Sequence, residues 1–143
     1  MKNIILLFLM LFGLSNCVKK EESKNIEGTW KMVYAEIIEG DSIELKDLSN
    51  TTFIKIINKS HFAFFNQENN SNANFYGGAG TYTLQGDNYT EILNFTAVEA
   101  IKNHPFSFTI EIKGDTLIQS GIEKVEAAGM DRYIIEKYIK LKK

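Results

Sequence analysis

From residue 28 onward the chain is a succession of short segments rich in β-branched and aromatic residues, separated by turn residues. Residues 106–113 alternate apolar and polar side chains at every position, which is the period of a strand with one dry face and one wet face. Gly86-Asp87-Asn88 joins two such segments, and these residue types tolerate the positive φ of a hairpin turn. The pattern predicts an antiparallel all-β fold.

Eight strands are predicted, at residues 28–38, 52–57, 61–66, 81–85, 89–95, 106–113, 116–120 and 133–141. Residues 67–74 and 121–131 are expected as variable loops, and residues 97–103 as a loop or a single helical turn. The last segment also has apolar residues at helical spacing, but its many Ile and Tyr residues favour a strand. Eight strands with short connections close most simply into a small antiparallel up-and-down β-barrel, because closure leaves no exposed edge.

The N-terminus predicts a secretion signal rather than part of this domain. A basic start precedes the apolar run 4–14, which is shorter than the roughly 20 residues of a transmembrane helix. Leu14-Ser15-Asn16-Cys17 resembles the bacterial lipobox, although Asn16 stands where Gly or Ala is usual. The resemblance implies that the signal peptide, residues 1–16, is removed and that Cys17 carries acyl chains such as palmitate.

Cys17 is the only cysteine, so an internal disulfide is excluded, whereas lipidation explains a lone cysteine. Residues 17–25 form a charged tether without core-building residues, before a domain at 26–143. The Lys-Glu-Glu within the tether is either a surface-export signal or a solvated spacer. The expected location is the bacterial outer membrane, lipid-anchored to the bilayer and facing the periplasm or the exterior.

Charge and motifs exclude several functional classes. The chain has 16 basic and 18 acidic residues, and this near balance gives no reason to expect a nucleic-acid partner. Neither His61 nor His104 has a partner at metal-ligand spacing, so no metal and no cofactor is expected. The glycine-rich residues 77–80 precede a strand rather than a helix, which indicates a bulge or mobile lip instead of a phosphate loop. No catalytic constellation is recognisable, and the protein is expected not to be an enzyme.

Gly28-Thr29-Trp30, the hairpin at 80–91 and Gly114-Asp115-Thr116-Leu117 together resemble the lipocalins and related calycins. The resemblance covers residues 26–143 and is to bacterial lipocalin-like lipoprotein domains. It implies that Trp30 closes the narrow end of the barrel and packs against a basic side chain near the chain end. Lys140 is the candidate for that partner, with Arg132 as the alternative.

An eight-stranded barrel is about wide enough either to be filled by side chains or to hold one small ligand. The candidates for lining a pocket are aromatic residues on a plausible inward phase: Tyr34, Phe62, Phe64, Tyr82, Tyr89, Phe106 and Phe108. Glu91 either shares that inward phase, where its carboxylate needs a partner or a proton, or points outward with Ile92 inside.

Two functions remain open at this stage. A hollow barrel predicts binding of a small apolar or amphipathic ligand in the cell envelope. A filled barrel predicts a non-enzymatic interaction module, which contacts another envelope or extracellular protein through the loops at 68–74 and 121–131. The volume inside the barrel distinguishes the two.

Overall fold

The computed structural model of the protein describes residues 24–142. The predicted signal peptide and Cys17 therefore lie outside the described residues. The described part contains two short 3-10 helices, η1 (Glu99–Ile101) and η2 (Glu126–Ala128). Its nine strands are β1 (Gly28–Glu39), β2 (Ser42–Leu45), β3 (Thr51–Ile57), β4 (His61–Glu68), β5 (Tyr76–Gln85), β6 (Asn88–Thr96), β7 (Pro105–Lys113), β8 (Thr116–Val125) and β9 (Met130–Lys140).

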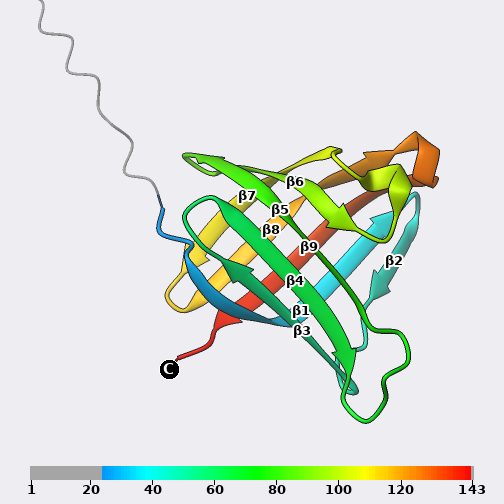
Figure 1. Cartoon of the computed structure of the whole chain (residues 1–143), viewed down its shortest axis with the longest axis horizontal. Coiled ribbons are helices and arrows are strands. Elements are labelled where there is room, and N and C mark those ends of the chain that lie inside the picture. The colour runs from blue at the N-terminus through cyan, green and yellow to red at the C-terminus, as the bar shows by residue number, and fades with distance from the viewer. Residues whose placement is uncertain (1–23, 143) are drawn as a thin grey trace, which may run out of the picture.

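Eight of these strands, β1 and β3 to β9, form a closed antiparallel barrel (Figure 1). Each of them pairs with the next along the chain, and β9 pairs back with β1, which places Trp30 opposite Lys140. The predicted all-β up-and-down barrel is confirmed. The helical alternative for the last segment is wrong, because β9 is needed to close the sheet between β8 and β1.

The short strand β2 was not predicted. Only Gly28 to Lys31 of β1 pair with β3, so the second half of that edge needs another partner for its backbone groups. β2 supplies it by pairing with Glu36 to Glu39. All four residues of β2 are exposed, so its side chains carry no alternation of buried and exposed positions that a sequence pattern could show.

The predicted loop at 121–131 is also wrong, since β8 continues to Val125 and β9 starts at Met130. Gly121 permits this continuation: a Cβ there would lie 2.8 Å from the carbonyl oxygen of Ser107 on β7. The loop expected at 67–74 is shorter than predicted, because β4 extends to Glu68 and the loop begins only after it. Of the two alternatives for residues 97–103, a loop or a single helical turn, the helical turn is present as η1.

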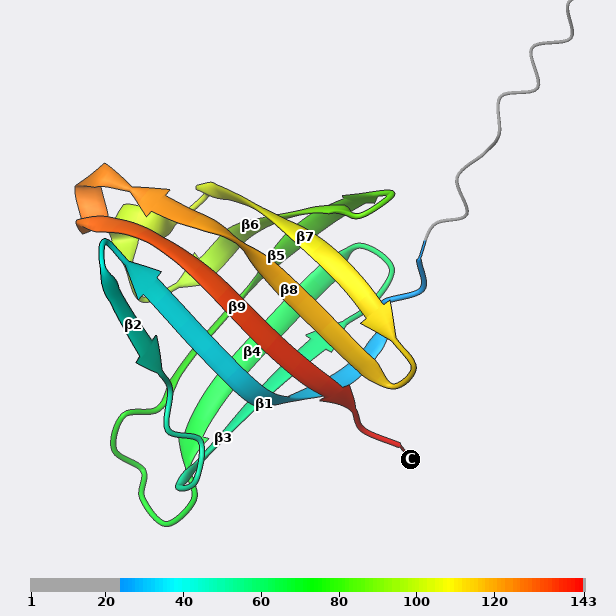
Figure 2. The same cartoon turned by 180° about the vertical axis from the view of Figure 1, so that it is seen from behind.

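The two ends of the barrel differ. One end carries the tight β3–β4, β5–β6 and β7–β8 turns, and Figures 1 and 2 show that the described part of the chain begins and ends there. The opposite end carries β2, η1, η2 and the connection between β4 and β5. The most completely buried side chains are Trp30, Tyr89, Tyr138, Ile26, Ile110 and Leu117. All six come from the halves of their strands nearest the described chain ends or from the segment leading into β1, so we call this the closed end.

Candidate functional site

The closed end is sealed by Trp30. Its indole is 2% exposed and donates a hydrogen bond of 2.9 Å to the carbonyl oxygen of Ile26. The ammonium of Lys140 lies 5.2 Å from the centre of the indole, which is cation–π distance. Lys140 therefore occupies the position that the calycin resemblance implies for the basic partner, whereas Arg132 lies toward the other end of β9.

Gly28 is required by this arrangement. Its φ of +147° lies in a region that side chains with a Cβ rarely adopt. A Cβ at this position would also lie 2.6 Å from Cε of Lys140, which is closer than van der Waals contact allows. The glycine of the Gly-x-Trp motif thus leaves room for the lysine stem that crosses it to reach the indole.

A cavity of about 730 Å³ occupies the other half of the barrel. Its wall is predominantly apolar and includes Met32, Ala35, Phe53, Phe64, Leu93, Phe106, Phe108 and Ile134. Its rim carries apolar side chains from the connection before β5, the end of β6, η1 and the start of β9: Phe75, Phe95, Val98, Ile101 and Met130. This half of the barrel interior is therefore hollow, whereas the closed end is filled by side chains.

The glycine-rich start of β5 forms one wall of the cavity. A Cβ on Gly78 would lie 2.7 Å from Leu93 and 2.9 Å from the Phe64 ring, so a larger residue would take up cavity space or displace these side chains. Between Ala79 and Gly80 the pairing with β6 shifts register, so of the two alternatives predicted for residues 77–80 the bulge is present. The glycines keep this wall thin next to two of the cavity's apolar side chains.

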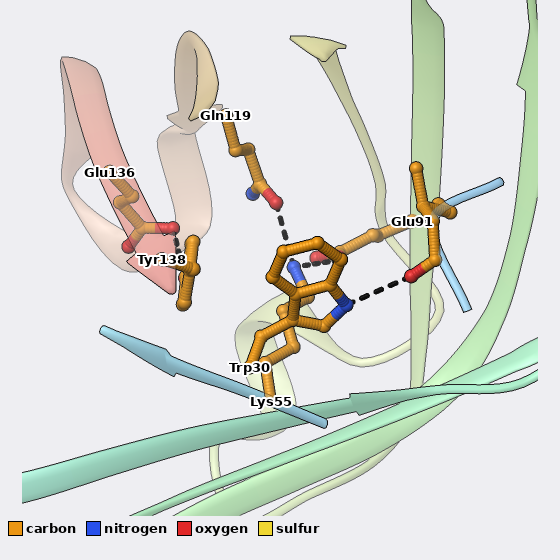
Figure 3. Close-up of polar contacts among 7 residues, drawn as sticks. Trp30, Lys55, Glu91, Gln119, Glu136 and Tyr138 are labelled. Carbon is orange, nitrogen blue, oxygen red and sulfur yellow. Dashed lines mark hydrogen bonds and ion pairs between the residues drawn. The ribbon is translucent and has the colours of Figure 1, made fainter. Parts of the chain in front are cut away.

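Charged and polar side chains form the inner end of the cavity. Lys55 on β3 is 3% exposed, forms an ion pair with Glu91 on β6 and donates a hydrogen bond of 2.7 Å to Oε1 of Gln119 on β8. Figure 3 shows the Lys55 ammonium turned toward both partners. The same ammonium lies 5.3 to 5.8 Å from the centres of three aromatic rings, those of Tyr89, Phe62 and Tyr138. Such enclosure lets a lysine charge be buried.

Glu136 on β9 is the second carboxylate at this level. Its Oε2 accepts a hydrogen bond of 2.6 Å from the Tyr138 hydroxyl, as Figure 3 shows. Burial raises the pKa of the Glu136 carboxyl above its ordinary value, and the charge of Lys55 and the Tyr138 hydroxyl oppose this rise in part. Glu123 and Glu91 add to the rise in the pKa through charge repulsion. Burial is the dominant cause.

A further ion pair lies nearer the rim. Arg132 of β9 contacts Oε2 of Glu123 on β8 through Nη2 at 2.6 Å and donates to it through Nε at 2.7 Å. Both residues line the cavity, and they face each other across the β8–β9 ladder. The positive charge of Arg132 is therefore neutralised by Glu123 in the cavity wall.

The structure separates the predicted pocket residues into three groups. Phe64, Glu91, Phe106 and Phe108 line the cavity, so the inward phase of Glu91 is settled. Phe62 and Tyr89 are buried inside the barrel without lining the cavity. Tyr82 lies at the closed end, where its ring centre is 5.2 Å from that of Tyr89 and its hydroxyl donates to the carbonyl oxygen of Asn58.

The inward orientation expected for Tyr34 is wrong. A bulge between Met32 and Tyr34 shifts the phase of β1, so that Ala35 instead of Tyr34 follows Met32 on the inner face. The Tyr34 ring contacts the ammonium of Lys137, 4.5 Å from its centre. Sequence reasoning missed three polar residues that the structure brings to the cavity: Gln119 and Glu136 in its wall, and Lys55, hydrogen-bonded to Gln119, at its inner end.

Within residues 24–142, no group of three or more His, Cys, Asp or Glu side chains is placed to hold a metal ion. The exposed His61 contacts the Ser60 hydroxyl through Nδ1, and His104 packs edge-on against the Phe106 ring. No helix in this part of the chain has the length and apolar character needed to cross a membrane.

Comparisons with known proteins give a family and little more. The family model DUF4488, described as a domain of unknown function, matches residues 25–143. A crystal structure of an uncharacterized protein from Bacteroides eggerthii DSM 20697, at 2.60 Å resolution, is similar with a TM-score of 0.47 and 16% sequence identity. The similarity covers 78% of this chain and 98% of that one. A search of curated proteins found no match.

Proposed function

The chain belongs to the DUF4488 family, and we propose that its barrel binds a small amphipathic molecule in the interior cavity without catalysing a reaction. The observation that carries the proposal is the cavity itself, about 730 Å³ with a mainly apolar wall and a few polar groups at its inner end. Small-molecule sites have about 300 to 1,000 Å³ and the same combination of apolar wall and few polar groups. The hollow interior favours this function over that of a filled interaction module.

Uptake of a neutral fluorescent probe, N-phenyl-1-naphthylamine, tests the proposal. We expect saturable binding of one probe per chain, seen as a rise in fluorescence when the probe enters an apolar site. Ala35→Phe places a ring in the cavity wall and should abolish uptake, whereas Val33→Phe on the exposed side of the same strand should not. Absence of uptake by the unaltered protein, or equal uptake by both variants, would contradict ligand binding in this cavity.

The proposed setting of this binding is the bacterial outer membrane, with the protein held by acyl chains on Cys17 and facing the periplasm or the exterior. The lipobox resemblance of residues 14–17 supports it. Stable anchoring of this kind requires more than one acyl chain. Cys17→Ser should move the protein from the membrane fraction to the soluble fraction, and membrane retention of this variant would refute the anchor.

A second candidate is a contact between the rim and another envelope protein. Exposed apolar side chains gather there, with Phe95 at 71% exposure, Phe75 at 59% and Val98 at 50%. Exposed apolar patches mark interaction sites more often than chance. Replacing Phe75 and Phe95 with Ser should weaken crosslinking to a partner in intact cells, and unchanged crosslinking would refute a rim contact.

A further inference from the structure

The charges that face the barrel interior do not cancel. Lys55 is paired with Glu91, and Arg132 is paired with Glu123. Glu136 lines the same cavity, yet no ion pair within residues 24–142 includes it. The inner part of the cavity therefore holds one carboxylate more than its cations neutralise.

Other nearby cations are already engaged or lie elsewhere. Lys46 lines the cavity at the rim, where its ammonium donates to the Tyr76 hydroxyl at 2.6 Å and lies 5.7 Å from the Phe53 ring centre. Lys55 is within electrostatic range of Glu136 but makes its close contacts with Glu91 and Gln119. A charged group inside a protein is stable only when it is paired and hydrogen-bonded.

The carboxylate of Glu136 is accessible from the cavity. Its neighbours in register are Gln119 on β8 and Ala35 on β1, and the Ala35 methyl is too short to cover it. Tyr138 donates to Oε2, and Oε1 accepts no hydrogen bond within the described part of the chain. One oxygen of this carboxylate is thus left for a group inside the cavity.

We propose that the cavity selects a cationic amphiphile, an apolar body bearing a protonated amine, and that the Glu136 carboxylate pairs with the amine. This inference rests on the proposed function and specifies its ligand class. An ammonium supplies the missing positive charge and up to three hydrogen-bond donors. The apolar body lies against Phe64, Leu93 and Phe106 in the outer part of the cavity.

The competing ligand classes fit less well. A fatty carboxylate would add a negative charge next to Glu136, Glu91 and Glu123, and Lys55 is already neutralised by its own partner. A fatty alcohol would hydrogen-bond to Glu136 but leave its charge without a counter-ion. Like charges brought close together in a buried site cost more than in water, because the dielectric screening there is lower.

Displacement of the bound probe by dodecylamine, dodecanol and dodecanoate tests this selectivity with one chain length and three head groups. For the full chain carrying Cys17→Ser, at pH 8, we expect dodecylamine to displace the probe at a concentration at least tenfold below that of dodecanol. Dodecanoate should be the weakest competitor. Glu136→Gln keeps the acceptor for Tyr138 and should bring dodecylamine down to the level of dodecanol, whereas Glu111→Gln, the same substitution on an exposed strand position, should not.

Lowering the pH gives an independent readout. An alkylamine stays protonated between pH 8 and pH 5, as a lysine side chain does. The groups that face Glu136 are Lys55 on β3, Glu91 on β6, Gln119 and Glu123 on β8, and Tyr138 on β9. Its register neighbour on β1 is Ala35, and Glu36 of β1 also lines the cavity. Protonation of Glu136 removes the charge that attracts the amine, so the amine preference should shrink toward pH 5.

The outcomes separate the two proposals. If the unaltered cavity takes up no probe, the proposed function fails and this inference fails with it. If the probe binds but dodecylamine is no better than dodecanol or dodecanoate, the cavity binds ligands and only the inferred ligand class is wrong. A preference for the amine that survives Glu136→Gln would overturn the role of Glu136.

Discussion

Removing the positive charge of Lys55 should destabilise the barrel far more than removing an exposed lysine. Lys55→Met keeps a long unbranched side chain among the three rings but leaves Glu91, 6% exposed, without its counter-ion. It also leaves Oε1 of Gln119 without its donor. Breaking a buried ion pair on one side costs about 3–5 kcal/mol, because a buried charge is left unmatched.

The exposed pair of Lys113 and Glu111 provides the matched control. Its nitrogen–oxygen distance is 3.0 Å, but both side chains are more than half exposed. Pairs of this kind contribute about 0–1 kcal/mol, so Lys113→Met should be close to neutral. Removing both charges, in Lys55→Met with Glu91→Leu, should recover most of the lost stability, since an apolar pair of similar volume often replaces a buried ion pair without loss.

Urea unfolding followed by circular dichroism at pH 7 measures all four proteins. A domain of this size has a free energy of unfolding of about 5–15 kcal/mol, so the expected loss is a large shift in the urea midpoint. The reasoning is refuted if Lys55→Met costs no more than Lys113→Met, or if the double variant is less stable than the single one. Either result would mean that Glu91 is not buried against Lys55.

Three further outcomes follow from the site. Trp30→Ala should lower the free energy of unfolding by about 3–5 kcal/mol, as loss of a buried aromatic does, and a loss below about 1 kcal/mol in urea unfolding would remove its sealing role. Gly28→Ala should cost about 1–3 kcal/mol through its positive φ, and the cost should be smaller in a Lys140→Ala background if the clash contributes. Because burial raises the pKa of Glu136, the folded state binds its proton more tightly than the unfolded chain, and the associated stability is lost as pH rises through the Glu136 titration. Glu136→Gln should therefore gain stability relative to the unaltered protein between pH 4 and pH 8, and a difference that does not change with pH would contradict this.

The barrel was predictable because side-chain alternation and turn residues are local signals. Residues 106–113 and the turn at 86–88 fix two hairpins, and the strand count then leaves closure as the simplest solution. β2 was not predictable, because its role is to pair the edge of β1 that β3 leaves open, and that need arises only in three dimensions. The outward turn of Tyr34 likewise follows from a bulge set by pairing with β9.

The polar end of the cavity was largely missed for a different reason. Lys55 shares a strand phase with the buried Phe53 and Ile57, but Ile54 and Ile56 make the opposite phase equally apolar. The sequence pattern therefore does not decide which face of β3 points inward. The same pattern, a polar residue on the strand face of buried apolar residues, occurs twice more. Gln119 shares a face with Leu117, and Glu136 shares one with Ile134 and Tyr138. The sequence singles out only Glu91 and does not decide between its inward and outward orientations.

The opposed ends of the barrel set a direction for the molecule. The chain enters the domain at the closed end, which Trp30 seals. An attachment through the N-terminus would therefore hold the barrel at its closed end. The mouth, bordered by Phe75 and Phe95, then faces away from the point of attachment. With the anchoring proposed for Cys17, a ligand would enter and leave through this mouth rather than directly from the lipid.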